Sequence, residues 1–110
     1  MPYIAGDRRE LDGLIDRLAE SIVRRVEGEG SEVAFAGLLN YACTRLALKV
    51  VRLKFGAMRY WLIAIITGIF TNIADEFYRR VAVPYENKQL ARHGDVDLYE
   101  EYSLDIEKMK

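Results

Sequence analysis

One run of sequence decides the fold: RYWLIAIITGIFTNIADEFYRRVAVPYE, from Arg59 to Glu86. Its first half, Tyr60 to Ala74, contains no charged residue, so a helix built from it is apolar on every side. Its second half carries charged side chains on one face only, and Pro84 removes a backbone donor where the helical pattern stops. We therefore expect a long helix, ended or kinked at Pro84, against which the rest of the chain packs.

Two further helices are expected before this run. The first starts with a capping box formed by Asp7 and Glu10 and ends at Gly28–Gly30. Its apolar residues recur at spacings of three and four: Leu11, Leu14, Ile15, Leu18, Ile22 and Val26. The second starts at Ser31 and Glu32, shows a helical period from Leu38 to Phe55, and stops before Gly56. Its apolar seam is narrow and consists of Leu39, Cys43, Leu46, Val50 and Leu53.

The domain organisation follows from length and composition. A chain of 110 residues forms one domain, and two prolines with eight glycines argue against an all-β fold. After Pro84 we expect a short helix from Tyr85 to Arg92, closed by Gly94. The sequence thus predicts an all-α fold: a small bundle of three main helices and a short C-terminal helix over residues 1–94. We expect residues 95–110 to form an acidic, partly mobile tail that is extended through Val96 and Tyr99 and continues as a frayed helix or as disordered chain.

The charges are unevenly distributed along the chain. A net charge of −1 predicts no strong overall field, so we expect neither nucleic acid nor a membrane as partner. No acidic residue lies between Glu32 and Asp75, and five basic residues do: Arg45, Lys49, Arg52, Lys54 and Arg59. From Asp95 onward, the chain contains six acidic residues and two lysines. Three interpretations stay open: the acidic end lies near the basic middle, both are solvated, or the basic segment binds a partner.

Several function classes have no support in the sequence. Cys43 is the only cysteine, which excludes an internal disulfide and a cysteine metal cluster, and we expect it to be buried as a small apolar residue. His93 is the only histidine and has no identifiable partner for acid–base chemistry. Charged residues occupy the N-terminus where a signal peptide requires an apolar stretch. A cytoplasmic location is therefore expected.

The apolar run from Tyr60 to Ala74 is expected to be buried against other helices or in a membrane. Its 15 residues span about 22 Å as a helix, short of the roughly 20 residues that cross a bilayer, so burial in protein is the better explanation. Trp61, Ile65 and Gly68 lie on the side opposite the main apolar stripe. A small bundle has few helices to cover that side, so we expect these three residues to form an interface with a second copy of the chain.

One group of polar residues is a candidate site. Asn72, Asp75, Glu76 and Arg79 share one flank of the long helix, and Asn40 and Thr44 share a face of the preceding one. Helical enzymes that cleave nucleoside triphosphates hold Mg²⁺ with carboxylates three or four residues apart. Here only Asn72 and Glu76 have that spacing, because Asp75 and Glu76 are adjacent and diverge by 100°. Ion pairs from Asp75 to Arg79 and from Glu76 to Arg80 are the simpler interpretation.

Four blocks of sequence resemble a known family. They are MPYI at residues 1–4, LNY at Leu39–Tyr41, EFYRRVAVPYE at Glu76–Glu86, and HGDVD at His93–Asp97, which is similar to the NGDVY near the family's end. Their order resembles that of a family of short, uncharacterised helical proteins from microbes and their viruses. The resemblance implies a compact helical fold and no known activity. Family members carry an acidic residue where this chain has Thr71 and Asn72, so a carboxylate-pair site of the family would be lost here.

These observations predict a cytoplasmic, non-catalytic binding or assembly protein. Its expected partner is a second copy, as a dimer, or another protein, and no cofactor is expected. The alternative is a metal-dependent nucleoside triphosphate pyrophosphohydrolase. It would use Asp75 and Glu76 as catalytic residues with Asn40 and Asn72 in support, and Glu76 would hold Mg²⁺. A membrane-associated helical protein is the third possibility.

Overall fold

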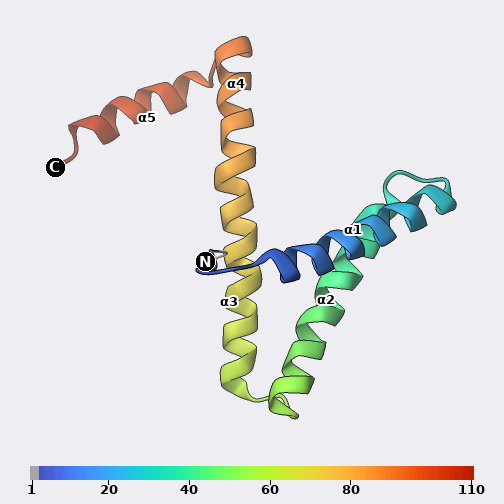
Figure 1. Ribbon diagram of the computed structural model, residues 1–110. Helices are drawn as coiled ribbons and strands as arrows, with labels where there is room; N and C mark the ends of the chain where they lie inside the picture. The colour runs from blue at the N-terminus through green and yellow to red at the C-terminus, as the bar shows by residue number, and fades with distance from the viewer. Residues whose placement is uncertain (1–2) are drawn as a thin grey trace. The chain divides into compact units, whose positions relative to one another are not determined.

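The computed structural model describes residues 3–110, all of whose regular structure is helical (Figure 1). The helices are α1 (Arg9–Glu29), α2 (Ala34–Phe55), α3 (Tyr60–Phe77), a π turn η1 (Tyr78–Ala82), α4 (Val83–His93) and α5 (Asp97–Lys108). The all-α prediction is confirmed. The chain forms two units, an N-terminal one up to Ile69 and a C-terminal one over Phe70–Lys110. The first two residues of the MPYI motif lie outside the described residues.

The N-cap residue of helix α1 is Arg8, not the predicted Asp7, and no side chain caps the helix. The Asp7 carboxylate accepts the backbone N–H of Arg9 at 3.0 Å and binds its guanidinium at 2.7 Å. Both bonds from Arg9 hold the pKa of Asp7 below its usual range, and the bond from the Arg9 side chain has the larger effect. The expected capping box is wrong, because Glu10 makes no hydrogen bond within residues 3–110.

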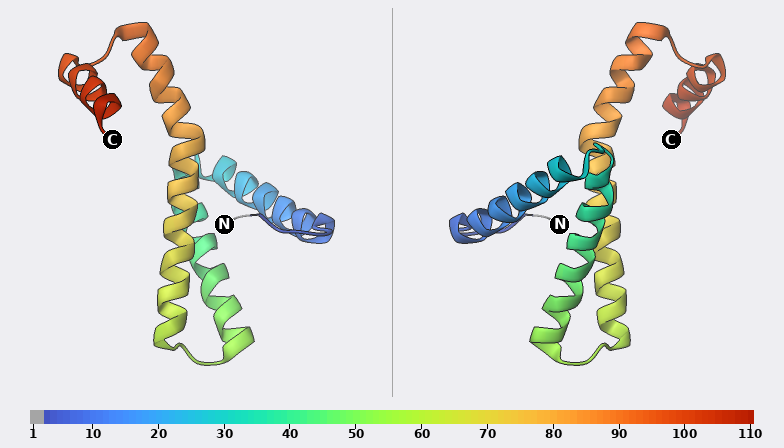
Figure 2. Two further views of the ribbon diagram at one scale, coloured as in Figure 1. Left: turned by 90° about the vertical axis from the view of Figure 1, so that its left-hand side faces the viewer. Right: turned by 90° about the vertical axis from the view of Figure 1, so that its right-hand side faces the viewer.

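Helices α1 and α2 form a hairpin that is closed only near its turn. α1 ends at Gly30, whose φ of 69° lies in the left-handed region. Next to the turn, Ile22 and Val26 of α1 face Phe35 and Leu39 of α2 across a joint apolar groove. Figures 1 and 2 show the two helices separating away from that turn. The N-terminal half of the α1 apolar stripe therefore stays exposed.

The turn between α2 and α3 holds a small apolar centre. Phe55 and Trp61 pack edge to face with ring centroids 5.2 Å apart. Val51 and Leu62 beside them are 4% and 3% exposed. Gly56 adopts a φ of 79°, donates its N–H to Arg52 O, and accepts the Arg52 guanidinium at 2.6 Å. Arg52 thus closes the C-terminal end of α2.

The long helix continues through Pro84. No coil residue separates α3, η1 and α4, so the helix does not end at Pro84. The alternative expectation, that Pro84 lies in the first turn of a further helix, is confirmed, because Pro84 is the second residue of α4. The accommodation is the π turn, in which Val83 donates its N–H to Tyr78 O, five residues earlier. In an unbroken α-helix the Arg80 carbonyl would face the missing N–H and the ring of Pro84. In a π turn each carbonyl accepts the N–H five residues ahead and not the one four residues ahead. The Arg80 carbonyl then no longer has to face Pro84.

The end of the chain is more helical than expected. Gly94 closes α4 with a φ of 84° and an N–H bond to Leu90 O, as predicted. Val96 is extended, but α5 starts at Asp97, so the predicted extension through Tyr99 is wrong. Asp97 and Glu100 in the first turn favour the helix, because acidic groups stabilise its positive N-terminal end. The mobility of residues 95–110 stays a prediction.

Among residues 3–110, neither unit encloses a hydrophobic core of its own. Within residues 3–110 only Val51 and Leu62 are buried, and every α-helix exposes large apolar side chains. A side chain that is exposed in the whole structure is at least as exposed in its unit alone. The shortage of buried apolar side chains is therefore a property of each unit by itself. Cys43 is also exposed, and its predicted burial is wrong within one chain, because no described element covers that seam of α2.

One described helix is long and apolar enough to cross a membrane. It is α2, by length and composition, and not the run from Tyr60 to Ala74. The match is weak evidence, since core helices of soluble proteins pass the same test. The C-terminal half of α2 carries four basic residues, and each costs about 2.5–3.5 kcal/mol at the centre of a bilayer.

The turn at Gly56 supplies a prediction about stability. Gly56→Ala should lower the free energy of unfolding by at least about 1 kcal/mol, because an L side chain is strained at this positive φ. The matched control is Gly37→Ala inside α2, where an added Cβ meets nothing within 4 Å. Helix propensity predicts a gain of about 0.5–1 kcal/mol there. Urea unfolding measures both, and equal effects would contradict the described turn.

Candidate functional site

The polar residues that the sequence singles out belong to two units. Asn40 and Thr44 lie on α2 in the N-terminal unit. Asn72, Asp75 and Glu76 on α3, with Arg79 in η1, lie in the C-terminal unit. Each group is therefore a local arrangement with its own chemistry.

Asn40 and Thr44 contact each other, as their spacing predicts. The Thr44 hydroxyl donates to the Asn40 carbonyl at 2.8 Å and lies 3.4 Å from the Asn40 side-chain oxygen. Both residues line an open groove of about 540 Å³ together with Ala36, Gly37 and Tyr41. A hydroxyl bonded to the carbonyl four residues back is satisfied within its own helix. This pair is therefore a polar lining and contains no activated nucleophile.

Glu76 is the centre of the second group. Its carboxylate accepts the Arg79 guanidinium at 2.7 Å and the Arg80 guanidinium at 3.4 Å. The Glu76 side chain is 23% exposed, whereas both arginines are well exposed. The predicted pair of Glu76 with Arg80 is confirmed. The predicted pair of Asp75 with Arg79 is wrong, because the longer Glu76 side chain reaches Arg79 three residues ahead.

The same group offers little to a metal ion. Asp75 makes no hydrogen bond or ion pair within the described part of the chain. No cluster of three or more His, Cys, Asp or Glu side chains occurs among residues 3–110. A cation at Glu76 would have to compete with two guanidinium groups for one carboxylate. The chemistry of this donor set suits ion pairing better than Mg²⁺, which takes several oxygen ligands.

The π turn creates a contact that the sequence did not indicate. The Tyr78 hydroxyl lies 3.3 Å from both carboxylate oxygens of Glu86, eight residues away. In an unbroken α-helix, eight residues separate two side chains by 80° around the axis. The extra residue of a π turn reduces that angle and aligns them. Pro84 is the signal in the sequence for this arrangement, since its missing N–H is compatible with a helix that widens just before it.

The three residues expected at an interface are accessible. Trp61 is 46% and Ile65 is 51% exposed on α3. A Cβ added at Gly68 would meet nothing within 4 Å, so no described element crosses α3 closely at that point. The predicted crossing of a second copy at Gly68 stays a prediction.

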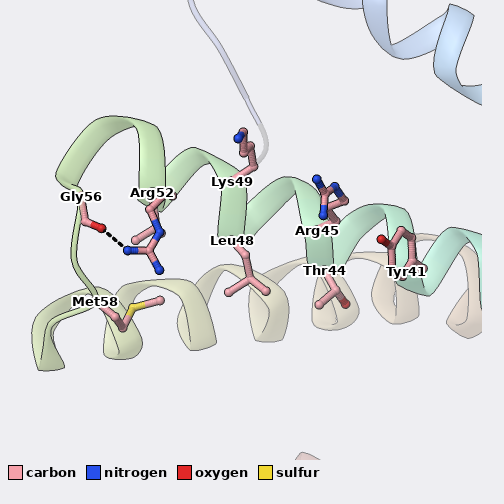
Figure 3. A pocket seen from close by; sticks show the side chains of 9 residues that line it. Tyr41, Thr44, Arg45, Leu48, Lys49, Arg52, Gly56 and Met58 are labelled. Carbon is pink, nitrogen blue, oxygen red and sulfur yellow. Dashed lines mark hydrogen bonds between the residues drawn. The ribbon is translucent and has the colours of Figure 1, made fainter.

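A basic groove runs along α2 (Figure 3). It has a volume of about 420 Å³, and Tyr41, Thr44, Arg45, Leu48, Lys49, Val51, Arg52, Gly56 and Met58 line it. Arg45 and Lys49 point to one side of the helix, and Thr44 and Leu48 point to the other. Arg52 is engaged with the Gly56 carbonyl, as the dashed line in Figure 3 shows. The groove thus has a cationic flank and an apolar flank.

Comparison with known proteins identifies the family. A family model described as a domain of unknown function, DUF6899, matches residues 1–96. The chain belongs to this family. No curated protein and no solved structure matches it. The DUF6899 match covers α1 to α4 and ends one residue before α5.

The ion pairs of Glu76 can be tested by neutralisation. Glu76→Gln should lower the free energy of unfolding by about 0.5–1 kcal/mol, because exposed helical pairs contribute about 0.3–0.5 kcal/mol each. Asp75→Asn is the matched control and should have no effect, since Asp75 has no partner among the described residues. Urea unfolding at low ionic strength and at about 1 M salt measures both. A loss for Asp75→Asn as large as that for Glu76→Gln would contradict the described pairing.

Proposed function

We propose that this protein is a non-catalytic assembly protein that works as a homo-oligomer, most simply a dimer, in the cytoplasm. One observation carries the proposal: in the part of the chain that the structure describes, neither unit buries a core, although its helices carry ordered apolar stripes. Burying one large apolar side chain contributes about 1.5–3 kcal/mol, and a chain of this size has few other sources of stability. The missing burial must therefore come from contacts beyond each unit.

A second copy of the chain suits these apolar faces best. Large exposed side chains occur on several helices, among them Leu46 and Leu53 on α2 and Trp61 and Ile65 on α3. Obligate homodimers cover such faces with interfaces of roughly 2,000–5,000 Å² that resemble a domain core cut in half. A net charge of −1 places little repulsion between two copies. Self-association is thus favoured by apolar area and hardly opposed by charge.

Gly68 supports a helix crossing in that dimer. Glycine inside a helix costs about 1 kcal/mol relative to alanine, and nothing in the described chain uses the space at Gly68. Small residues let two helices approach closely. A partner helix that crosses α3 beside Trp61 and Ile65 would offset that cost.

The hydrolase alternative retains the spacing of Asn72 and Glu76, but Glu76 is held by Arg79 and Arg80. It requires Glu76 to bind Mg²⁺ in the presence of a nucleoside triphosphate. The Glu76→Gln variant also tests this alternative. A melting temperature that rises only with metal and nucleotide together, and fails to rise in that variant, would favour the enzyme.

The dimer is tested by light scattering across a concentration series. The natural chain should be a dimer at micromolar concentration, and Gly68→Ala should raise the dissociation constant about tenfold, equivalent to about 1.4 kcal/mol. The reason is that the added methyl group obstructs the crossing, although alanine favours the helix itself. Gly28→Ala is the matched control, at another open helical glycine, and should leave association unchanged.

Two outcomes would contradict the proposal. A natural chain that stays monomeric at micromolar concentration would remove its basis. A Gly68→Ala chain that dimerises as tightly as the natural one would remove Gly68 from the interface.

A further inference from the structure

Helices α2 and α5 carry exposed charges of opposite sign and equal size. α2 contains Arg45, Lys49, Arg52 and Lys54 and no acidic residue, which gives it a charge of +4. α5 contains five acidic residues and Lys108, which gives it a charge of −4. Oppositely charged surfaces of this kind select partners and fix their register.

The groove on α2 has unused cationic groups. Arg45 and Lys49 are exposed and make no hydrogen bond or ion pair within residues 3–110. They border a groove whose other lining includes the apolar side chains of Leu48, Val51 and Met58. The groove therefore suits an occupant that is apolar in the middle and acidic along one edge.

Helix α5 has that character. Leu98, Tyr102 and Ile106 recur at a spacing of four and form an apolar stripe, and all three are more than half exposed. Glu101 and Asp105 border this stripe, also four residues apart. A helix of 12 residues is marginal in water unless its apolar face packs against something. α5 is therefore a helix that requires a partner surface.

We propose that α5 of one copy docks in the α2 groove of a second copy. Tyr102 and Ile106 then pack against Leu48 and Met58, and the acidic edge of α5 faces the cationic flank of the groove. The spacings agree, because Arg45 to Lys49 and Glu101 to Asp105 each span four residues, about 6 Å along a helix. This inference rests on the proposed dimer and adds the contact that sets its specificity.

A second copy is the occupant that the chain itself indicates. α5 is exposed at every residue, and its charge balances that of α2. In a two-fold symmetric dimer the contact forms twice, since each copy supplies one groove and one α5. The family match ends before α5, so this contact would be added to the proposed association of residues 1–96.

Two charge-reversed full-length chains test this contact. The first carries Arg45→Glu and Lys49→Glu, and the second carries Glu101→Lys and Asp105→Lys. Each alone should dimerise about tenfold more weakly at an ionic strength of about 10 mM, where screening is slight, because like charges meet in both contacts. An equimolar mixture should recover the natural affinity as a heterodimer, because both of its contacts again join opposite charges. Sedimentation velocity with one fluorescently labelled chain measures this.

The control carries Arg17→Glu and Arg24→Glu on exposed positions of α1, which change the net charge as much as the first variant does. It should dimerise as the natural chain does. Natural affinity in both reversed variants would overturn the inference and leave the proposed dimer intact. The inference would also be overturned if both variants dimerise more weakly and their mixture does not recover the natural affinity. In that case α5 would bind its own chain, or the groove would bind another anion. A natural chain that is monomeric would instead overturn the dimer itself.

Discussion

The apolar faces of the helices, left uncovered within each unit, are the constraint on which the rest of this protein depends. An amphipathic helix is stable in a protein because its apolar stripe is removed from water, and propensity alone rarely suffices. Here α1 and α2 meet only beside their turn, and α2 and α3 bury only Val51 and Leu62 at theirs. The described part of the chain therefore has well-defined helices with few buried apolar contacts inside their own unit.

Two local arrangements stabilise the ends and turns of these helices in place of a buried core. Gly56 and Arg52 close α2 with two hydrogen bonds, so the turn to α3 is fixed by backbone geometry. The π turn carries the helix past Pro84, and ion pairs of Glu76 with Arg79 and Arg80 support its N-terminal end. Such exposed pairs contribute only tenths of a kcal/mol each. They stabilise the helix locally but cannot replace the missing apolar burial.

The sequence predicts the helices better than their surroundings. The periodicity of apolar residues located α1, α2 and α3, and the glycines at positions 30, 56 and 94 marked helix ends. Spacing alone could not foresee that Pro84 would be absorbed by a π turn, because the missing N–H permits either a break or a widened turn. The sequence also predicted wrongly that Cys43 is buried. An apolar seam on a helix indicates that its residues pack against another element, but it does not show whether the same chain supplies that element. For the candidate site, i,i+4 spacing paired Glu76 with Arg80 correctly but missed that Glu76 also takes Arg79.

The central claim is that folding and association of this chain are one process. The most direct measurement is the urea midpoint of unfolding, followed by circular dichroism over a hundredfold range of protein concentration. If a second copy supplies the core, the midpoint rises with concentration, because mass action stabilises the associated folded state. A midpoint that stays constant over that range would show that a single chain completes its own core, and would contradict the account.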